Sequence, residues 1–163
     1  MITIRPVDEN SVEACASLQC TPEQRQFTNS PIWSLLETAY TPLNQHCRLY
    51  AIYNEETVVG MVRLDFTLHD GYYEFTNLLI DQIHQRKHCA TEAIRQIIEV
   101  FRQDGRFQIL RIHVAPENTA AIRLYQKLGF TYAYRTEDQV FLDRNLLSSA
   151  YRSRCHRGRS SYC

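Results

Sequence analysis

The fold of this sequence is decided by residues 114–130, VAPENTAAIRLYQKLGF. The stretch predicts the end of a strand, a break at Pro116, a short helix from about Asn118 and a stop at Gly129. Asn118 starts that helix, and Tyr125, seven residues further on, lies almost in line with it. Taken alone, the pair would be a capping Asn and an amphipathic core Tyr. The i, i+3, i+4 and i+7 positions of one helix face are Ala121, Leu124, Tyr125 and Leu128.

A second feature lies upstream, where a strand around residues 78–80 leads into residues 85–91, QRKHCAT, and then into a helical pattern. The N-terminus of a helix offers backbone N–H groups without intrahelical partners and a partial positive charge. Such an end, placed directly after a strand, is a ready site for a phosphate. The sequence therefore predicts an anion-binding loop, with Arg86, Lys87 and His88 adding positive charge.

The string N-x-x-A-I-x-L-Y-x-K-L-G-F, residues 118–130, resembles the signature of the GNAT family of N-acetyltransferases, and the upstream loop stands where that family binds pyrophosphate. The resemblance covers most of residues 2–145. It implies an α/β (α+β) fold, with a mixed, mostly antiparallel sheet, a splayed central strand pair and helices on both faces. It also implies acetyl-CoA as co-substrate, with Asn118 and Tyr125 facing the thioester and Tyr125 as general acid toward the sulfur.

The upstream loop departs from the family pattern Q/R-x-x-G-x-G/A. Gln85 and Ala90 match, whereas His88 stands where the family has Gly and Arg86 replaces a common Gly. Glycine lets the backbone approach the pyrophosphate and tolerates unusual φ values. Either the cationic run holds the phosphates by charge while the backbone still cradles them, or the loop is distorted and CoA binds weakly. We favour the first outcome, because the downstream motif is intact.

The resemblance also implies how the rest of CoA is held. In the family, the strand at residues 78–80 splays from its neighbour, here residues 111–114, and pantetheine adds to the exposed backbone like an extra strand. Pro116 fits this splay, because proline cannot donate to a strand ladder. The CoA-binding residues implied are Leu78, Leu79, Ile80, Gln85, Arg86, Lys87, His88, Cys89, Ala90, Thr91 and Asn118.

The reaction implied is direct attack by a substrate amine on the acetyl carbonyl in a ternary complex, where holding both reactants supplies most of the effect. An alkylamine has a pKa of about 10.4 and must lose a proton before it attacks. Glu74, on the strand that leads to the loop, is the candidate base, acting through water; the alternative is an exposed strand carboxylate without a role. Cys89 is expected to be a small packed residue rather than a nucleophile.

The identity of the acetyl acceptor is only loosely indicated. Gln24-x-x-Phe27 and parts of residues 34–60 resemble the bacterial spermine/spermidine (diamine) acetyltransferase branch. The first 81 residues carry 4 Lys and Arg residues against 11 Asp and Glu residues, which suits a cationic substrate. Peptide N-termini, an antibiotic amine and a catalytically weak CoA-binding module remain as alternatives. The candidate carboxylates for a polyamine are Glu23, Glu37, Asp65 and Glu74.

Composition indicates one ordinary globular domain, because the 163 residues are 44% hydrophobic and carry 18 basic and 18 acidic residues. We expect an acetyltransferase domain at residues 1–147 and a basic, mobile tail at residues 148–163. The six cysteines form no C-x-x-C pair and the histidines are scattered, so no metal is expected. Without a signal peptide or a membrane-length apolar run, we expect a cytoplasmic enzyme with a small-molecule amine as partner, no membrane and no nucleic acid. The oligomeric state is left open, with a homodimer as one option.

Periodicity and turn residues predict the remaining elements. Strands are expected at residues 2–5, 50–53, 57–66, 72–80, 109–114, 130–135 and 140–142, and helices at 8–19, from 21 to about 41, at 89–101 and from about 118. Expected buried positions of the first three helices are Val12, Cys15, Ala16, Leu18, Ile32, Leu35, Leu36, Ala39, Ile94, Ile97, Ile98 and Phe101. The order of these elements gives a mixed sheet with helices on both faces.

Overall fold

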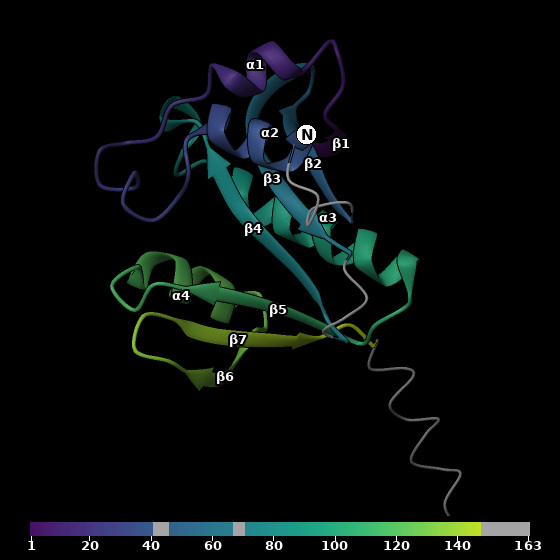
Figure 1. The fold of residues 1–163 in the computed structure, drawn as a ribbon, viewed down its shortest axis with the longest axis vertical. Coiled ribbons are helices and arrows are strands. Elements are labelled where there is room, and N and C mark those ends of the chain that lie inside the picture. Colours follow the sequence, from purple (N-terminus) through teal and green to yellow (C-terminus); the bar gives the residue numbers. More distant parts are fainter. Residues whose placement is uncertain (41–45, 67–70, 148–163) are drawn as a thin grey trace, which may run out of the picture.

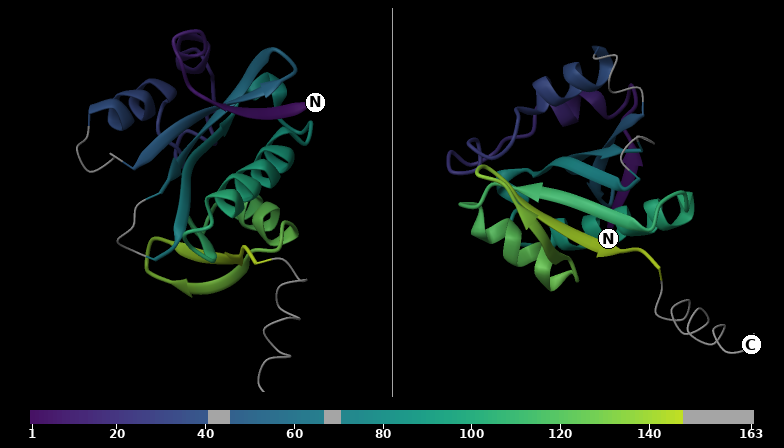
Figure 2. Two further views of the ribbon diagram at one scale, coloured as in Figure 1. Left: turned by 90° about the vertical axis from the view of Figure 1, so that its right-hand side faces the viewer. Right: turned by 60° about the horizontal axis from the view of Figure 1, so that its bottom comes forward.

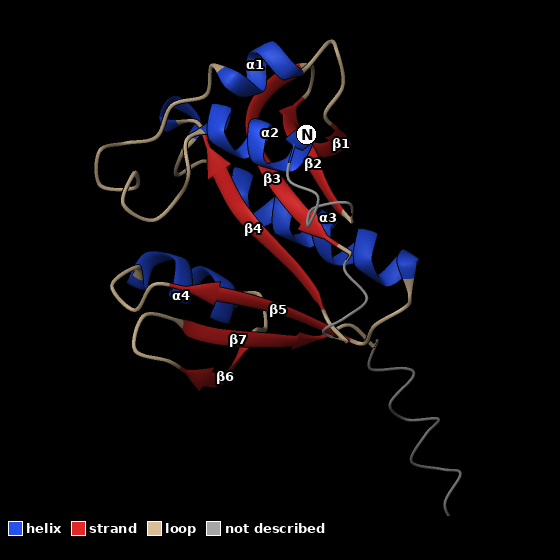
Figure 3. Ribbon diagram, in the orientation of Figure 1, coloured by secondary structure: helices blue, strands red, loops and turns tan. Residues whose placement is uncertain are grey.

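A seven-stranded sheet forms the centre of the molecule (Figures 1 and 3). The computed structural model describes residues 1–40, 46–66 and 71–147. The strand order is β1-β2-β3-β4-β5-β7-β6, and every neighbouring pair is antiparallel except β4 and β5. This confirms the expected mixed, mostly antiparallel sheet. The strands are β1 (Ile2–Pro6), β2 (Cys47–Asn54), β3 (Thr57–Asp65), β4 (Tyr73–Ile80), β5 (Ile109–Val114), β6 (Thr131–Arg135) and β7 (Val140–Asn145).

Helices cover both faces of the sheet, as expected. Figure 2 shows α1 (Val12–Ala16) and α2 (Pro31–Tyr40) on one face, and α3 (Cys89–Asp104) and α4 (Thr119–Lys127) on the other. A short 3-10 helix, η2 (Gln82–His84), connects β4 to the loop before α3. Within the described residues, no helix is both long enough and apolar enough to cross a bilayer.

The main core lies between the sheet and the pair α3 and α4. In α3, the predicted face is confirmed, since its four apolar residues are all buried: Ile94, Ile97, Ile98 and Phe101. The helix ends at Gly105, whose φ of +70° and backbone N–H bond to the Phe101 carbonyl are those of a left-handed C-cap. Burial of a full amphipathic stripe makes this helix the best predicted of the four.

The first predicted helix, residues 8–19, is largely wrong. Only Val12–Ala16 is helical, because the Asp8 carboxylate accepts hydrogen bonds from the backbone N–H groups of Asn10 and Ser11 and turns the chain before the helix. Cys15 and Leu18 are buried as expected, whereas Val12 is exposed.

The second predicted helix starts later and turns a different face to the core. Residues 22–27 form turns, and α2 begins at Pro31, where the Ser30 hydroxyl accepts a hydrogen bond from the backbone N–H of Trp33. Pro31 and Ser34 are buried, whereas Ile32 and Leu36 are 57% and 47% exposed; of the four positions expected to be buried, only Leu35 packs against the core. The sequence PIWSLLETAY is apolar almost all round, and its periodicity therefore does not single out one face.

The expected splay of the central strand pair is confirmed. β4 and β5 are parallel and pair only at Tyr73 with Leu110 and at Glu74 with Arg111; beyond this closed end they diverge, as Figure 1 shows. On its other side β4 carries a bulge, at which Asn77 has a φ of +52°. The backbone of β4 beyond Glu74 therefore has no strand partner on its β5 side within the described residues.

Tyr73 fixes the closed end. Its ring stacks on Phe101, with centroids 4.5 Å apart, and is fully buried. Its hydroxyl donates to Asp104 and accepts from the backbone N–H of Arg106 at 2.7 Å. The start of β4 and the end of α3 are thus tied together at the point from which β4 and β5 diverge. The predicted tail, residues 148–163, and the Thr41-Pro42 helix end lie outside the described residues.

Candidate active site

A cleft of about 900 Å³ lies where β4 and β5 diverge. It is lined by the end of β4, the loop before α3, the starts of α3 and α4, the end of β5 and residues from the segment 20–28. All the sequence-predicted site residues except Lys87 and Glu74 line this one cleft. Several residues that the site prediction omitted also line the cleft. They include Gln24, Phe27, Gln139 and residues 112–115, 120, 121 and 124.

The loop before α3 has a left-handed backbone at the two positions where the family pattern has glycine. Arg86 and His88 have φ values of +59° and +62°, in the left-handed region that favours glycine, and His88 is the N-cap of α3 without a side-chain cap bond. This conformation costs a residue with a Cβ about 1–2 kcal/mol. Both side chains line the cleft, so the loop keeps a glycine-like backbone while presenting a guanidinium and an imidazole.

Other side chains of the loop hold it in place. Gln85 donates from Nε2 to Oε1 of Gln24 at 2.6 Å and to the carbonyl of Ile80 at 3.0 Å, which ties the loop to β4 and to the segment 20–28. Lys87 donates from Nζ to the carbonyl of Ile83 at 2.9 Å and does not line the cleft. Cys89 is buried, with Sγ 3.8 Å from the Lys87 carbonyl, which fits a packed residue at a helix start.

Asn118 has a structural role as well as a place in the cleft. Its Oδ1 accepts a hydrogen bond from the backbone N–H of Ala121 at 3.2 Å, so it caps α4. Because Oδ1 is used in this way, Nδ2 is the group left to donate to a ligand, and it has no partner among the described residues.

Tyr125 projects from α4 between two aromatic rings. It is 9% exposed, and its ring lies 5.9 Å from Phe75 and 5.6 Å from Phe130 between centroids. Its hydroxyl has no hydrogen-bond partner in the described part of the chain, although the residue lines the cleft. Burial raises the pKa of this phenol above its ordinary value, so it stays protonated across the physiological range. A protonated phenol at a cleft wall can donate a hydrogen bond or a proton to a ligand in the cleft.

Glu74 lies at the closed end of the strand pair and reaches the cleft only through a neighbour. Its Oε1 is 2.5 Å from Nδ1 of His113, which lines the cleft from β5. The hydrogen bond to Glu74 raises the pKa of His113 above its ordinary value, against the opposing effects of burial and of Arg63. His113 falls within the strand expected at residues 109–114, but it was not among the predicted site residues. Its alternation with Arg111 does place both on one sheet face, but the pairing with β4 was not evident.

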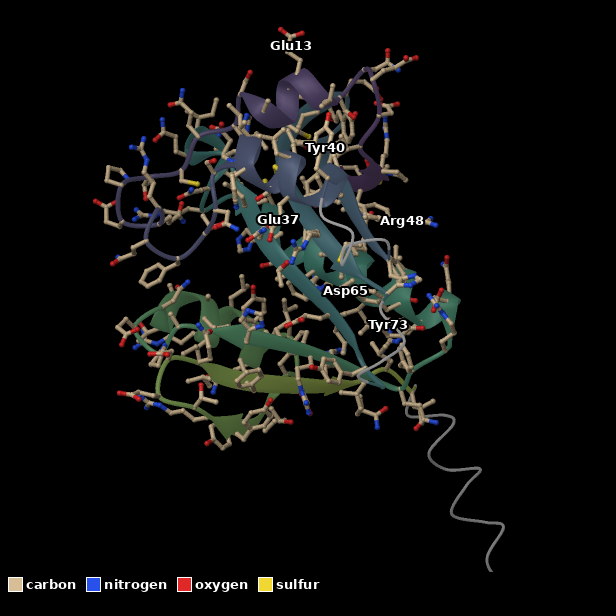
Figure 4. All side chains as sticks on the ribbon, in the orientation of Figure 1. Glu13, Glu37, Tyr40, Arg48, Asp65 and Tyr73 are labelled. Carbon is tan, nitrogen blue, oxygen red and sulfur yellow. The ribbon has the colours of Figure 1, made fainter. Side chains whose placement is uncertain are left out.

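The other candidate carboxylates are divided between the cleft and the sheet. Glu23 lines the cleft. Glu37, on α2, lies 3.1 Å from Nη1 of Arg63, and Arg63 also donates to the Thr76 hydroxyl at 3.1 Å. Asp65 is opposite Glu74 across β3 and β4. Figure 4 shows Glu37 and Asp65 over the part of the sheet formed by β3 and β4. In the part of the chain that the structure describes, no group of three or more His, Cys, Asp or Glu residues is placed to hold a metal ion.

The family follows from comparison with known proteins. The profile of the acetyltransferase (GNAT) family matches residues 12–130, which include the loop before α3, the splayed strands and the helix of Tyr125. The chain therefore belongs to the acetyltransferase (GNAT) family.

Individual relatives are more distant. An uncharacterized N-acetyltransferase of Bacillus subtilis (strain 168), YobR, is 28% identical over 82 residues, which are 50% of this chain and 32% of that protein's length. The structure of a spermidine N-acetyltransferase from Vibrio cholerae, in complex with CoA and spermine, has a TM-score of 0.70 at 18% identity, covering 89% of this chain and 95% of that one. The ribosomal-protein-S18-alanine N-acetyltransferase from Escherichia coli has a TM-score of 0.69 at 19% identity, with both chains covered completely. At these identities the structures share the fold, and their acceptors differ.

Proposed function

We propose that this chain is an acetyl-CoA-dependent N-acetyltransferase that transfers the acetyl group to a primary amine by direct attack in a ternary complex. One observation carries the proposal: the left-handed loop before α3, the part of β4 without a partner on its β5 side, and Tyr125 all border one cleft. These three features suit a pyrophosphate, a pantetheine arm and a thioester sulfur in that order. They are the separate parts of one extended thioester co-substrate.

The roles follow from the side chains at each point. The backbone N–H groups at the start of α3 and the Arg86 guanidinium would hold the phosphates. Asn118 would donate from Nδ2 near the thioester, and Tyr125 would protonate the leaving thiolate. Glu74 would serve the amine side, through the His113 that it contacts.

For the acceptor, we propose a polyamine or diamine. The acidic surface of the first half supports a cationic acceptor, as does Glu23 at the rim of the cleft. Likeness to the Vibrio cholerae spermidine enzyme is consistent with it, although the fold is equally like that of a ribosomal-protein acetyltransferase. A peptide N-terminus is therefore the second candidate. The cytoplasmic location and a homodimer stay predictions from the sequence.

The test is CoA release from acetyl-CoA, followed with a thiol reagent, in the presence of a panel of amines. The panel comprises spermine, spermidine, putrescine, a peptide with an N-terminal alanine and an aminoglycoside. We expect turnover with the polyamines and little with the peptide. Turnover with the peptide alone would move the assignment to peptide N-termini, and CoA binding without any turnover would indicate a catalytically weak CoA-binding module.

A further inference from the structure

We propose that His113 accepts the first proton from the substrate ammonium group and that Glu74 is its positioning residue. The inference rests on the proposed N-acetyltransferase function and assigns the amine side of that reaction. The sequence had pointed to Glu74 alone, acting through water, but Glu74 does not line the cleft. His113 does line the cleft, and it is hydrogen-bonded to Glu74.

The hydrogen bond between the two side chains defines which nitrogen is available. Nδ1 of His113 is 2.5 Å from Oε1 of Glu74. In the neutral ring Nδ1 therefore carries the hydrogen and donates a hydrogen bond to the carboxylate. The lone pair is then on Nε2, which has no hydrogen-bond partner among the described residues. A neutral imidazole held in this tautomer by a carboxylate can act as a general base.

His113 and Tyr125 approach the cleft from different faces of the sheet. Thr76, two residues beyond Glu74 on β4, accepts a hydrogen bond from Arg63, and Arg63 forms an ion pair with Glu37 of α2. The sheet face that carries Glu74 and Thr76 is therefore the one covered by α1 and α2. Tyr125 belongs to α4 on the opposite face. A base on one face and an acid on the other suit a reaction in which the amine enters on one side of the acetyl carbon and the sulfur leaves on the other.

The groups around His113 act on its pKa in opposite directions, and the hydrogen bond to Glu74 is the largest effect, so the pKa is raised. Glu74 of β4 is its direct partner, and Arg63 of β3 opposes this charge. From β7, the Phe141 ring lies 5.9 Å from the imidazole. Further along the same face, Arg111 and Asp143 neutralise each other through two hydrogen bonds of 2.7 Å, and Glu37 of α2 is paired with Arg63. His113 is 39% exposed at its side chain, so protons can exchange with solvent.

Two protons leave the substrate nitrogen, since an ammonium R–NH3⁺ becomes an amide R–NH–CO–CH3. The first passes to Nε2 of His113 before the attack, and His113 later releases it to solvent. The nitrogen lone pair forms the C–N bond at the acetyl carbon, and the C–S bond breaks with its electron pair on sulfur. Tyr125 donates its proton to that sulfur. The second proton leaves the substrate nitrogen and reaches Tyr125 through solvent, which restores the phenol.

The test is the pH dependence of kcat/KM, measured with the best amine of the panel from about pH 5 to pH 9. We expect the wild-type rate to rise with pH through a midpoint above about 6.5, the ordinary pKa of histidine. His113→Gln should lower kcat/KM by about 10²–10⁴-fold and remove this rise. In Glu74→Gln, which loses the negative charge, the midpoint should move to lower pH. In His113→Ala, imidazole added to the solution should restore part of the rate.

Control measurements separate a catalytic role from a structural one. His46→Gln changes an exposed histidine at the start of β2 and should leave the rate and its pH profile unchanged. The CoA dissociation constant should be the same in all variants. Loss of rate without imidazole rescue and without a midpoint shift in Glu74→Gln would overturn the assignment of His113 alone, as would a His113→Gln variant with the wild-type profile. A wild-type chain that binds CoA but acetylates no amine would overturn the proposed function and His113 with it.

Discussion

At the scale of single residues, Tyr125 shows how far a motif defines a role. Its i+7 spacing from Asn118 predicted a shared helix face, and the structure brings both to one cleft. Spacing alone did not predict that the phenol would sit between Phe75 and Phe130 with its hydroxyl unpaired. The packing accounts for the ring, and the unpaired hydroxyl is the part of the side chain that a ligand in the cleft can contact.

Tyr125→Phe should lower turnover while leaving CoA affinity nearly unchanged. The ring keeps its packing against two neighbours, and only the proton donor is lost. General acid assistance is worth about 10²–10⁴-fold, and a thiolate is a fair leaving group, so we expect a fall of at least about tenfold. Single-turnover kinetics, in which product release does not limit the rate, are the measurement. Unchanged turnover in that experiment would show that Tyr125 has a packing role and takes no part in catalysis.

His88→Gly should be tolerated or should improve CoA affinity. The residue has a φ of +62°, so glycine relieves a conformational cost of about 1–2 kcal/mol and opens the backbone to the pyrophosphate. Isothermal titration calorimetry with CoA and urea unfolding measure the two effects. The matched control is Glu55→Gly in the β2–β3 turn, where φ is +58°, which should raise stability without changing CoA affinity.

The opposite result for His88→Gly would have a distinct signature. If the loop relies on the imidazole itself to hold the phosphates, the variant should bind CoA more weakly than the wild type. A loss of affinity in His88→Gly, with Glu55→Gly unchanged, would show that the side chain, and not backbone approach, is what this position contributes.

At the scale of elements, the sequence predicted well where one periodicity dominated. The face of α3 and the strand β5 follow directly from the spacing of apolar residues. It failed where local hydrogen bonds or uniform apolarity intervened, as at Asp8 before α1 and along α2. The splay of β4 and β5 came from family resemblance, because unpaired backbone leaves no mark on side-chain patterning.

Gly60 of β3 lies against the end of β4 that borders the cleft. A Cβ at Gly60 would lie 2.3 Å from the Leu79 carbonyl oxygen and 2.8 Å from the Cδ1 atom of Ile80, so Gly60→Ala must push β4 away from β3. We expect a loss of about 1–3 kcal/mol in the free energy of unfolding and weaker CoA binding, since residues 78–80 line the cleft. Urea unfolding and calorimetry measure these effects.

The control for this variant is Gly71→Ala. Gly71 has a φ of +72° with nothing within 4 Å of the added Cβ, so alanine there costs backbone strain alone. Its CoA affinity should equal that of the wild type. Equal affinity in Gly60→Ala as well would show that the position of β4 does not control CoA binding.

At the scale of the whole molecule, the proposed binding regions for the amine and for CoA come from different parts of the chain and differ in charge. The first 81 residues, with 11 acidic against 4 basic side chains, form β1 to β4 and the helices α1 and α2 on the proposed amine face. The loop before α3 and helix α4, on the proposed CoA side, follow in the chain. An extended anionic co-substrate and a cationic acceptor can therefore reach one cleft without competing for the same charges.

Acetyl-CoA should stabilise the whole domain by mass action. At a free concentration 100 times its Kd, a ligand that binds only the folded state adds about 2.7 kcal/mol. For a chain of this size each kcal/mol raises Tm by about 2–4 °C, so we expect a rise of about 5–11 °C. Pantetheine, which lacks the pyrophosphate, should give a much smaller rise at the same concentration.

In Arg86→Gly, which keeps the left-handed backbone but removes the guanidinium, the rise in Tm with acetyl-CoA should shrink and depend less on salt. Calorimetry that detects no CoA binding at about millimolar concentration, or an equal rise with pantetheine, would contradict a pyrophosphate site at residues 85–91.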